Sequence, residues 1–374
     1  MNAVSNHARA GTDGVPSVSR VGDHPGIGPG TRFAILTDGQ LQDVNGKMAH
    51  GILRFRADAA AAVIDARHAG QTADRLVPGV TAPVPVVATL QEALREAPTA
   101  LLLGTTPAGG QIADRWRPTI LAAIEAGLHV VSGMHAFLRD DPALAAAADR
   151  HGVALVDLRT PPKQLQLSSG RVLDLTAHRI VLTVGSDAAI GKMSTSLGLH
   201  RALRREGLQS EFVATGQTGI AIAGWGVAID RVIGDFMAGV TEELVLRAAE
   251  QASIVIVEGQ GSIAHPAFSS VTLGLIHGAG PTDLILCHDE RRTAVIGYER
   301  MPVPSLPRLI QTYEDLTSYL RPARVRAVAL NTSGLSDSDS KDAIKRTEDL
   351  TGLPATDAIR DGGTRLAGVV RDLI

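Results

Sequence analysis

The sequence predicts an α/β protein with two parallel-sheet domains. Its 374 residues exceed what one average core needs, so two domains are expected. Short Val-, Ile- and Leu-rich runs alternate with helix-compatible segments, and this alternation favours parallel sheets because parallel neighbours need a helix-length connection. The runs IVLTV (180–184), SIVIV (253–257) and AVAL (327–330) are almost wholly apolar, which suits a sheet covered on both faces.

In the first half of the chain, the expected strands are short apolar runs. They are residues 32–39, 59–70, 82–90, 100–110, 129–138 and 153–159. Helix-compatible segments at residues 90–97 and 117–127 lie between several of them. This order predicts a parallel sheet with helical crossovers over residues 31–165.

The alternation stops at residues 161–172, where paired prolines and polar residues stand, and then restarts. The expected strands of the second half are residues 179–185, 210–216, 253–261, 282–288 and 325–333. The expected helices are residues 192–207, 239–252, 313–321 and 338–352. We therefore place a second domain at residues 171–374. Residues 1–30 are rich in Gly, Pro, Ser and Asp and are expected to form a disordered tail.

Composition narrows the class of protein. A hydrophobic content of 44% with 20% charged residues is typical of a soluble globular chain with a substantial core. The net charge of −3 provides no drive toward nucleic acid or an anionic membrane, so neither is expected as a partner. The single cysteine, Cys287, cannot form an intramolecular disulfide and is expected in the core. Neither a secretory signal nor a membrane span is recognised, and a cytoplasmic location is expected.

The strand expected at residues 179–185 runs into VGSDAAIGKMST (184–195), the layout of a phosphate-binding loop. Such a loop works because backbone N–H groups and a helix N-terminus point at the anion, while a lysine adds positive charge. The spelling is irregular, because Ser186 stands where the first glycine is usual and Met193 replaces the usual hydroxyl residue. A glycine-containing turn with a chance lysine is the alternative, but the strand before and the helix after favour phosphate binding. The residues expected there are Gly185, Ser186, Asp187, Ala189, Gly191, Lys192, Met193, Ser194 and Thr195.

A second group of candidates follows the other strands of this domain. Glu258 ends an apolar strand and is expected to contact a metal or act as a base, since ligands bind at the carboxyl ends of such strands. Gln260 lies in the glycine-rich turn after it, which lets a ligand approach the backbone. Gln217 and Thr218 follow another strand at the same edge and either orient the substrate or simply turn the chain. Asp235 is a further carboxylate that can face this site.

Histidines are candidates for acid–base groups near neutral pH. His265 stands next to the glycine-rich turn and is the best candidate for a base or a phosphate contact. His277 and His288 are expected to be structural or peripheral, since their spacing forms no metal cage.

In the first domain, Arg117 and His135 are expected to hold a substrate carboxylate, because an arginine fork fits a carboxylate. Arg139 and Asp140 lie nearby, and a role in oligomer contacts is the alternative. No G-x-G-x-x-G fingerprint follows the first strand, so NAD is not expected.

Several motifs together resemble the DUF1611 family. They are GKMAHGILRF, PAGGQIADRWRPTI, GLHVVSGMHAFLRDDPALA, VGSDAAIGKMST, GQTGI, VEGQGSIAHPAFSSVTLGLIHGAGP and TGLPATDAIR. The resemblance implies a Rossmann-like N-terminal domain followed by a P-loop NTPase-like domain. It also implies transfer of an acetyl group from acetyl-CoA to the amine of an acidic amino acid such as D-glutamate, with the loop holding the CoA phosphates. The catalytic residues would then be Lys192, Glu258 and His265.

Two other functions stay open from the residues. The loop also resembles that of dethiobiotin synthetase, which favours an ATP- and Mg²⁺-dependent kinase or amide ligase with Ser194 and Glu258 at the metal. A nucleotide-binding sensor without turnover is the third possibility. A small-molecule substrate and a homo-oligomer are expected in the preferred case.

Overall fold

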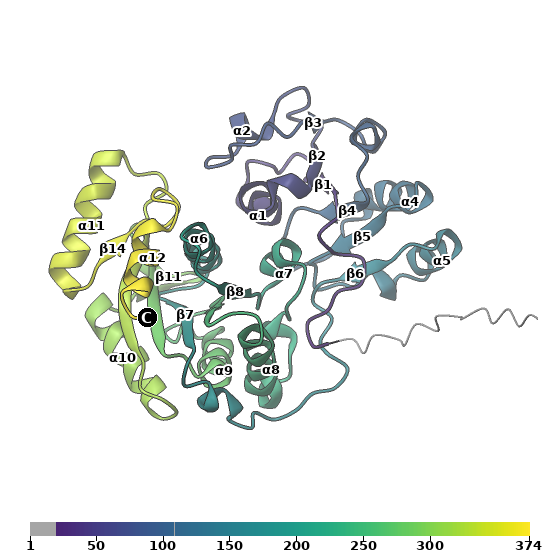
Figure 1. The fold of residues 1–374 in the computed structure, drawn as a ribbon. Coiled ribbons are helices and arrows are strands. Elements are labelled where there is room, and N and C mark those ends of the chain that lie inside the picture. The colour runs from purple at the N-terminus through teal and green to yellow at the C-terminus, as the bar shows by residue number, and fades with distance from the viewer. Residues whose placement is uncertain (1–19, 108) are drawn as a thin grey trace, which may run out of the picture.

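The computed structural model describes residues 20–107 and 109–374, and within them the chain forms two six-stranded parallel sheets and one small antiparallel hairpin. Figure 1 shows the two sheets in separate lobes, each flanked by helices. The predicted α/β class with two parallel-sheet domains is confirmed.

The first sheet has the strand order β3-β2-β1-β4-β5-β6. Its strands are β1 (Phe33–Leu36), β2 (Ala60–Ile64), β3 (Val86–Val87), β4 (Ala100–Leu103), β5 (His129–Ser132) and β6 (Leu155–Asp157). Its helices are α1 (Lys47–Phe55), α2 (Ala73–Leu76), α3 (Leu90–Ala93), α4 (Arg117–Glu125) and α5 (Pro142–His151). The order reverses between β1 and β4, so this is a doubly wound Rossmann-like sheet.

The second sheet has the order β14-β13-β10-β7-β9-β8. Its strands are β7 (Arg179–Gly185), β8 (Ser210–Val213), β9 (Ile254–Val257), β10 (Asp283–Asp289), β13 (Arg324–Asn331) and β14 (Ala355–Thr356). Its helices are α6 (Lys192–Arg205), α7 (Gln217–Ala223), α8 (Met237–Ala249), α9 (Ser269–Ala279), α10 (Leu306–Ser318), α11 (Asp337–Thr351) and α12 (Thr364–Arg371). β7 is central, because it pairs with both β9 and β10.

The hairpin and the short 3₁₀ helices complete the fold. β11 (Ala294–Val295) and β12 (Tyr298–Pro302) form the antiparallel hairpin between β10 and α10. The 3₁₀ helices are η1 (Val44–Gly46), η2 (Ala57–Ala59), η3 (Leu94–Glu96), η4 (Asp114–Trp116), η5 (Leu138–Asp140), η6 (Arg171–Asp174), η7 (Ile229–Arg231) and η8 (Gly234–Phe236). No helix in the described ranges has both the length and the apolar character of a membrane span.

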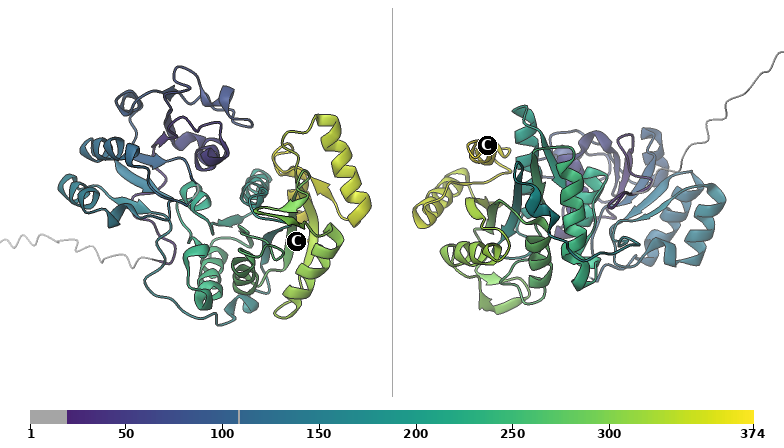
Figure 2. Two further views of the ribbon diagram at one scale, coloured as in Figure 1. Left: turned by 180° about the vertical axis from the view of Figure 1, so that it is seen from behind. Right: turned by 60° about the horizontal axis from the view of Figure 1, so that its bottom comes forward.

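The two domains share one hydrophobic core. Ile220 and Ile222 of α7 pack in the same buried cluster as Met48 and Ile52 of α1. The helices α1 and α7 lie side by side in Figure 1 and in the view from behind in Figure 2. The contact is close enough that a side chain at Gly51 would reach within 2.5 Å of Thr218. The pair therefore forms a packed seam between the sheets.

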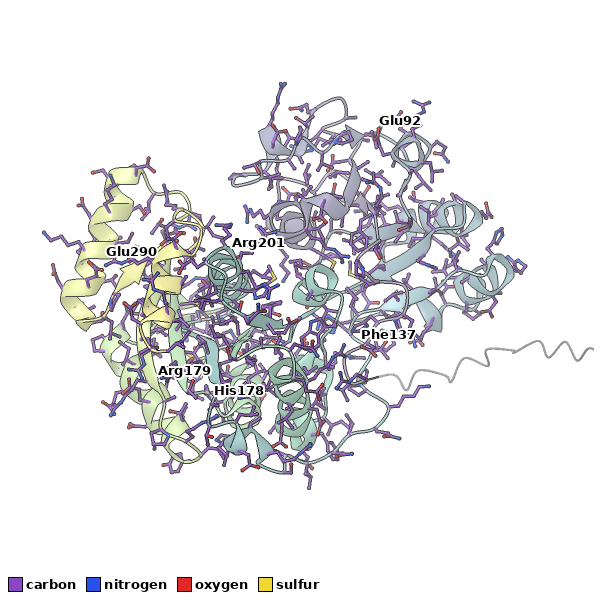
Figure 3. All side chains as sticks on the ribbon, viewed as in Figure 1. Glu92, Phe137, His178, Arg179, Arg201 and Glu290 are labelled. Atoms are coloured by element: carbon purple, nitrogen blue, oxygen red, sulfur yellow. The ribbon has the colours of Figure 1, made fainter. Side chains whose placement is uncertain are left out.

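Arginines reinforce this seam with bonds to main-chain carbonyls. Arg56 donates to the carbonyl of Ala221 at 3.0 Å, and Arg201 of α6 donates to the carbonyl of Arg54 at 2.9 Å. Figure 3 shows Arg201 between α6 and α1. The first bond links the end of α1 to α7, and the second links α6 to α1, so the first domain is tied to two helices of the second.

The prediction of a disordered tail over residues 1–30 is wrong for residues 20–30. Ile27 is buried in the core that both domains share, and Asp23 forms a β-bridge with Trp225. Arg247 of α8 donates to the carbonyl of Val21 at 2.7 Å. The Gly- and Pro-rich composition hides these anchors, because a few apolar and carbonyl groups are enough to fix a short strap. Residues 1–19, where the rest of the predicted tail lies, are outside the described residues.

Candidate functional site

The predicted phosphate-binding loop connects β7 to α6 at the carboxyl edge of the second sheet. Gly191 has φ 112°, a conformation that only glycine adopts readily, and it directly precedes the first turn of α6. Ala189 has φ 55°, a left-handed conformation that is uncommon for a residue with a side chain. The first N–H groups of α6 have no partners within the helix and point along its axis toward the loop. The loop therefore has the backbone shape of an anion cradle.

Lys192 is folded back over this loop. Its Nζ donates to the main-chain carbonyl of Asp187 at 2.7 Å, and the residue is only 5% exposed. Burial lowers the pKa of Lys192 to about 8, and the charge of Arg292 adds to this effect, whereas Asp187 and Glu258 oppose it. A nearby anion therefore favours the charged form of the Lys192 ammonium. A bound phosphate would supply such an anion.

The loop is held from behind by residues on and after β10. The carboxylate of Asp187 accepts from the N–H of Ile296 at 2.8 Å and pairs with Arg292 at 3.0 Å. Ser186 Oγ lies 2.8 Å from Nδ1 of His288. His288, which was expected to be structural or peripheral, therefore has the structural role, because β10 runs beside β7 and brings His288 to the loop. Arg292 was not predicted from the sequence. The adjacent basic residues Arg291 and Arg292 after β10 are a local signal, but the partner of Arg292, Asp187, lies 105 residues away.

Glu258 follows β9 and points under the start of α7. One carboxylate oxygen accepts from the N–H of Thr215 at 2.9 Å and from that of Gly216 at 3.1 Å. Burial raises the pKa of Glu258 to about 7; these two bonds lower it, the charge of Asp230 raises it further and Lys192 opposes the rise. A carboxylate poised near neutral pH is suited to accept a proton.

The other predicted residues of this domain lie around Glu258 in different ways. Gln217 and Thr218 begin α7 and are buried at the seam between the domains. Gln260 donates to the carbonyl of Thr215, so it braces the turn before α7. Asp235 is exposed on η8, and no described hydrogen bond or ion pair links it to Glu258 or Lys192. Ser194 and Thr195 lie in the first turn of α6, with Thr195 buried.

His265 is placed as a structural residue. Its Nδ1 accepts from the N–H of Ala267 at 3.1 Å, and its Nε2 lies 3.2 Å from the carbonyl of Ile296. Since Nδ1 accepts, Nε2 carries the proton and donates, so neither ring nitrogen is left to act as a base. The ring also stacks on Phe268. The structure thus gives no support to His265 as the base and makes it a clip that holds the hairpin; His277 is exposed on α9.

Cys287 is buried in β10, as predicted, beside Gly185 of β7. Burial raises the pKa of its thiol to about 11, while a hydrogen bond with Thr195 and the charge of Lys192 act in the opposite direction. The thiol is therefore protonated at neutral pH and fills the space beneath the loop rather than reacting.

The first domain brings His135 toward the site and leaves Arg117 away from it. Arg117 forms a two-pronged ion pair with Asp141, the residue that caps α5. The prediction that Arg117 holds a substrate carboxylate is therefore not supported, because an internal carboxylate already occupies its fork. His135 is exposed just after β5, where the charges of Arg159 and Asp230 act on it.

The residue directly after the loop lysine fits Mg²⁺ poorly, although Ser194 and Thr195 place hydroxyls in the same helical turn. The position after the lysine, where a hydroxyl ligand is usual, is Met193, and its terminal methyl group packs toward Gly51 of α1. A thioether is not a ligand for Mg²⁺, which prefers oxygen. Within residues 20–107 and 109–374, no cluster of three or more His, Cys, Asp or Glu side chains is arranged to hold a metal.

The fold and the site define a class: a two-domain α/β protein whose second sheet carries a phosphate-binding loop with a buried lysine and, after the neighbouring strand, a buried glutamate. Comparison with known families matches residues 166–367 to the DUF1611 domain of unknown function, described as a P-loop domain, and residues 66–161 to its Rossmann-like N-terminal domain. The chain belongs to the DUF1611 family.

Relatives of known name and structure agree with this membership. The chain is 38% identical over 279 residues to a D-glutamate N-acetyltransferase of Tritonibacter scottomollicae, covering 74% of this chain and 83% of that protein. It is 37% identical over 272 residues to a protein of the same name from a Pseudoalteromonas species, covering 72% and 81%. The crystal structure of a DUF1611 family protein from Anabaena variabilis superposes with a TM-score of 0.85 at 39% identity, covering 91% of this chain and 99% of that one. These relatives support an acetyltransferase-like role.

Proposed function

We propose that the protein transfers an acetyl group from acetyl-CoA to the amine of an acidic amino acid such as D-glutamate. The observation that carries the proposal is the similarity over most of the chain to two proteins named D-glutamate N-acetyltransferase. The site supports it, because acetyl transfer to an amine needs a base, and Glu258 has a pKa near 7.

In this proposal the loop holds the phosphates of CoA without hydrolysing a nucleotide. CoA carries a pyrophosphate and a ribose phosphate, and the backbone N–H groups at the start of α6 together with Lys192 suit such anions. The poor fit of Met193 to Mg²⁺ agrees with a reaction that needs no metal.

The chemical step balances with one residue moving a proton. Glu258 takes a proton from the substrate ammonium, and the freed amine nitrogen attacks the thioester carbonyl carbon. The tetrahedral oxyanion is stabilised by backbone N–H donors. When the C–S bond breaks, the nitrogen, which still carries two hydrogens, gives one of them to the CoA thiolate, and the amide product leaves. Glu258 then releases the proton that it took from the ammonium to solvent, so the products are the amide, the CoA thiol and one proton. Such a reaction uses a cytoplasmic pool of acetyl-CoA, and we expect a homo-oligomer.

Mass spectrometry of the purified protein tests the proposal. The reactions contain D- or L-glutamate with either acetyl-CoA or ATP and Mg²⁺, and Lys192→Ala serves as the inactive control. We expect N-acetylglutamate and free CoA without ATP. ADP formed only in the presence of the carboxylate substrate, with no acetylated product, would overturn the proposal and favour the kinase or ligase. Binding of nucleotide with no turnover in either mixture would favour the sensor.

A further inference from the structure

A group of charged side chains lies where the first domain meets the start of α7. Arg159, two residues after β6, donates to the carbonyl of Gly133 at 2.8 Å and pairs with Asp230 of η7 across the domain boundary. The Arg159 side chain is only 9% exposed, so its orientation is fixed by these partners. Lys47 begins α1 directly before Met48, and the terminal methyl of Met48 would lie 2.3 Å from a Cβ at Gly133, so the start of α1 adjoins this group. The charges of Arg159 and Asp230 also act on Lys47.

This group adjoins Glu258. A Cβ at Gly133 would lie 2.8 Å from the side chain of Gln217. Gly216, the residue before Gln217, donates its N–H to the Glu258 carboxylate. Asp230 is also near enough for its charge to raise the pKa of Glu258. Arg159 is therefore connected to Glu258, the base of the proposed reaction, through Gly133, Gln217 and Gly216.

Lys47 differs from the arginines of the seam. In the described part of the chain no carboxylate oxygen lies within 4.0 Å of its ammonium, and the residue is exposed to solvent. The pKa of Lys47 is nevertheless lowered, because surrounding protein removes water and Arg159 adds a like charge. An accessible ammonium beside a second cation is a favourable position for an incoming anion.

The charges of the group match those of an acidic amino acid. Lys47 and Arg159 supply positive charge from the first domain, while Asp230 and Glu258 supply carboxylates from the second. A dicarboxylic amino acid carries one ammonium and two carboxylates. We propose that Lys47, beside the Arg159–Asp230 ion pair, binds a carboxylate of the acceptor amino acid, and that the amine of the same molecule lies next to Glu258, the base. This inference rests on the proposed acetyl transfer for the identity of the acceptor.

The test is Lys47→Met, which keeps the length of the side chain and removes the charge. Lys345→Met is the matched control, because Lys345 is exposed on α11 at the far edge of the second domain (Figure 1). KM is measured for D-glutamate, for D-glutamine and for acetyl-CoA. We expect Lys47→Met to raise KM for D-glutamate about tenfold or more, since a charge-assisted bond is lost. KM for acetyl-CoA should stay within about twofold, because the CoA phosphates are held elsewhere.

The comparison of D-glutamate with D-glutamine gives a readout that a purely structural role of Lys47 would not change. The wild type should prefer D-glutamate to the uncharged side-chain amide, and Lys47→Met should lose most of this preference. An unchanged preference in Lys47→Met, or an increase in KM for acetyl-CoA alone, would overturn the inference while leaving acetyl transfer intact.

Isothermal titration with D-glutamate, in the presence and absence of CoA, keeps the test independent of turnover. If D-glutamate binds the wild type and binds Lys47→Met more weakly, the proposed site is supported. If no acetylated product forms in that case, only the proposed reaction is refuted and the binding site stands. Equal binding by both proteins, or no binding by the wild type in either condition, overturns the inference.

Discussion

The ammonium of Lys192 and the main-chain carbonyl of Asp187 are joined by a 2.7 Å hydrogen bond inside the phosphate-binding loop. The bond holds a buried positive charge in place before any ligand arrives. Burying this charge costs free energy of folding, and burial accordingly lowers the pKa of Lys192 from 10.5 to about 8.

Lys192→Met should therefore abolish activity and stabilise the fold at neutral pH. A lowered lysine pKa means that the folded state disfavours the charged form, so removing the charge should raise the free energy of unfolding by about 1–3 kcal/mol. Turnover should fall at least about 100-fold, since the positive charge that holds the CoA phosphates is lost. Thermal unfolding and product formation are measured together. A lower melting temperature than that of Lys341→Met, an exposed control on α11, would contradict the expectation.

Gly219→Ala should displace Glu258. A Cβ at this position would lie 2.3 Å from Glu258 Oε2, and the carboxylate cannot stay where it is. We expect kcat to fall by about tenfold to 100-fold, because the base moves by the order of an ångström. Gly368→Ala in α12 is the control, since its Cβ would meet only ordinary contacts at 3.6 Å. Equal activity of the two variants would rule out the placement of Glu258 as base.

The pH profile should be narrow and bell-shaped. The rate should increase as pH rises through about 7, where Glu258 loses its proton, and decrease above about 8, where Lys192 loses its own. Glu258→Gln should remove the rising limb together with most of the activity. The measurement is kcat/KM for acetyl transfer between pH 5.5 and 9. A rising limb that survives in Glu258→Gln would assign the base elsewhere.

The same group should make stability depend on pH. The folded-state pKa of Glu258 is raised above the ordinary value of 4.5, so the favourable contribution of this group to stability is present below pH 4.5 and is lost as pH rises through about 7. Glu258→Gln should thus gain stability relative to the wild type at pH 8 but little at pH 4.5. Chemical denaturation at both pH values measures the difference, and an equal gain at both would contradict the buried ionisation.

Tyr313→Phe should destabilise the loop from below. The phenol of this fully buried residue donates to the carbonyl of Gly185 at 2.7 Å and accepts from the N–H of Ile263 at 3.1 Å. Removing the hydroxyl leaves a buried carbonyl and a half-buried N–H without this partner, which costs about 1–3 kcal/mol. Tyr319→Phe, at a residue that is 82% exposed, should change the free energy of unfolding by less than about 0.5 kcal/mol. Similar values for both would show that the buried hydroxyl has no structural role.

Features carried by neighbouring residues were predictable from the sequence. The alternation of apolar runs and helices predicted both sheets, and the Gly191-Lys192 pair after a strand located the loop. Glu258 could be placed at the same edge because parallel strands all end on one side.

Features that depend on distant packing were not predictable. Asp141 neutralises Arg117 from 24 residues away, and the carbonyl of Ile296 engages His265 from 31 residues away. His288 reaches the loop only because β10 pairs with β7. Lys47 and Arg159 carry no motif of their own, and only the folded chain brings them to Asp230.

The core that crosses from α1 to α7 limits how the molecule can move. A hinge opening of the two domains would expose Met48, Ile52, Ile220 and Ile222 to water, and interfaces of this apolar kind do not separate as ordinary domain pairs do. Reactants must therefore enter and products leave through rearrangement of loops and long side chains, with the two sheets staying fixed against each other. A mutation that loosens the seam would then act on both halves of the site at once.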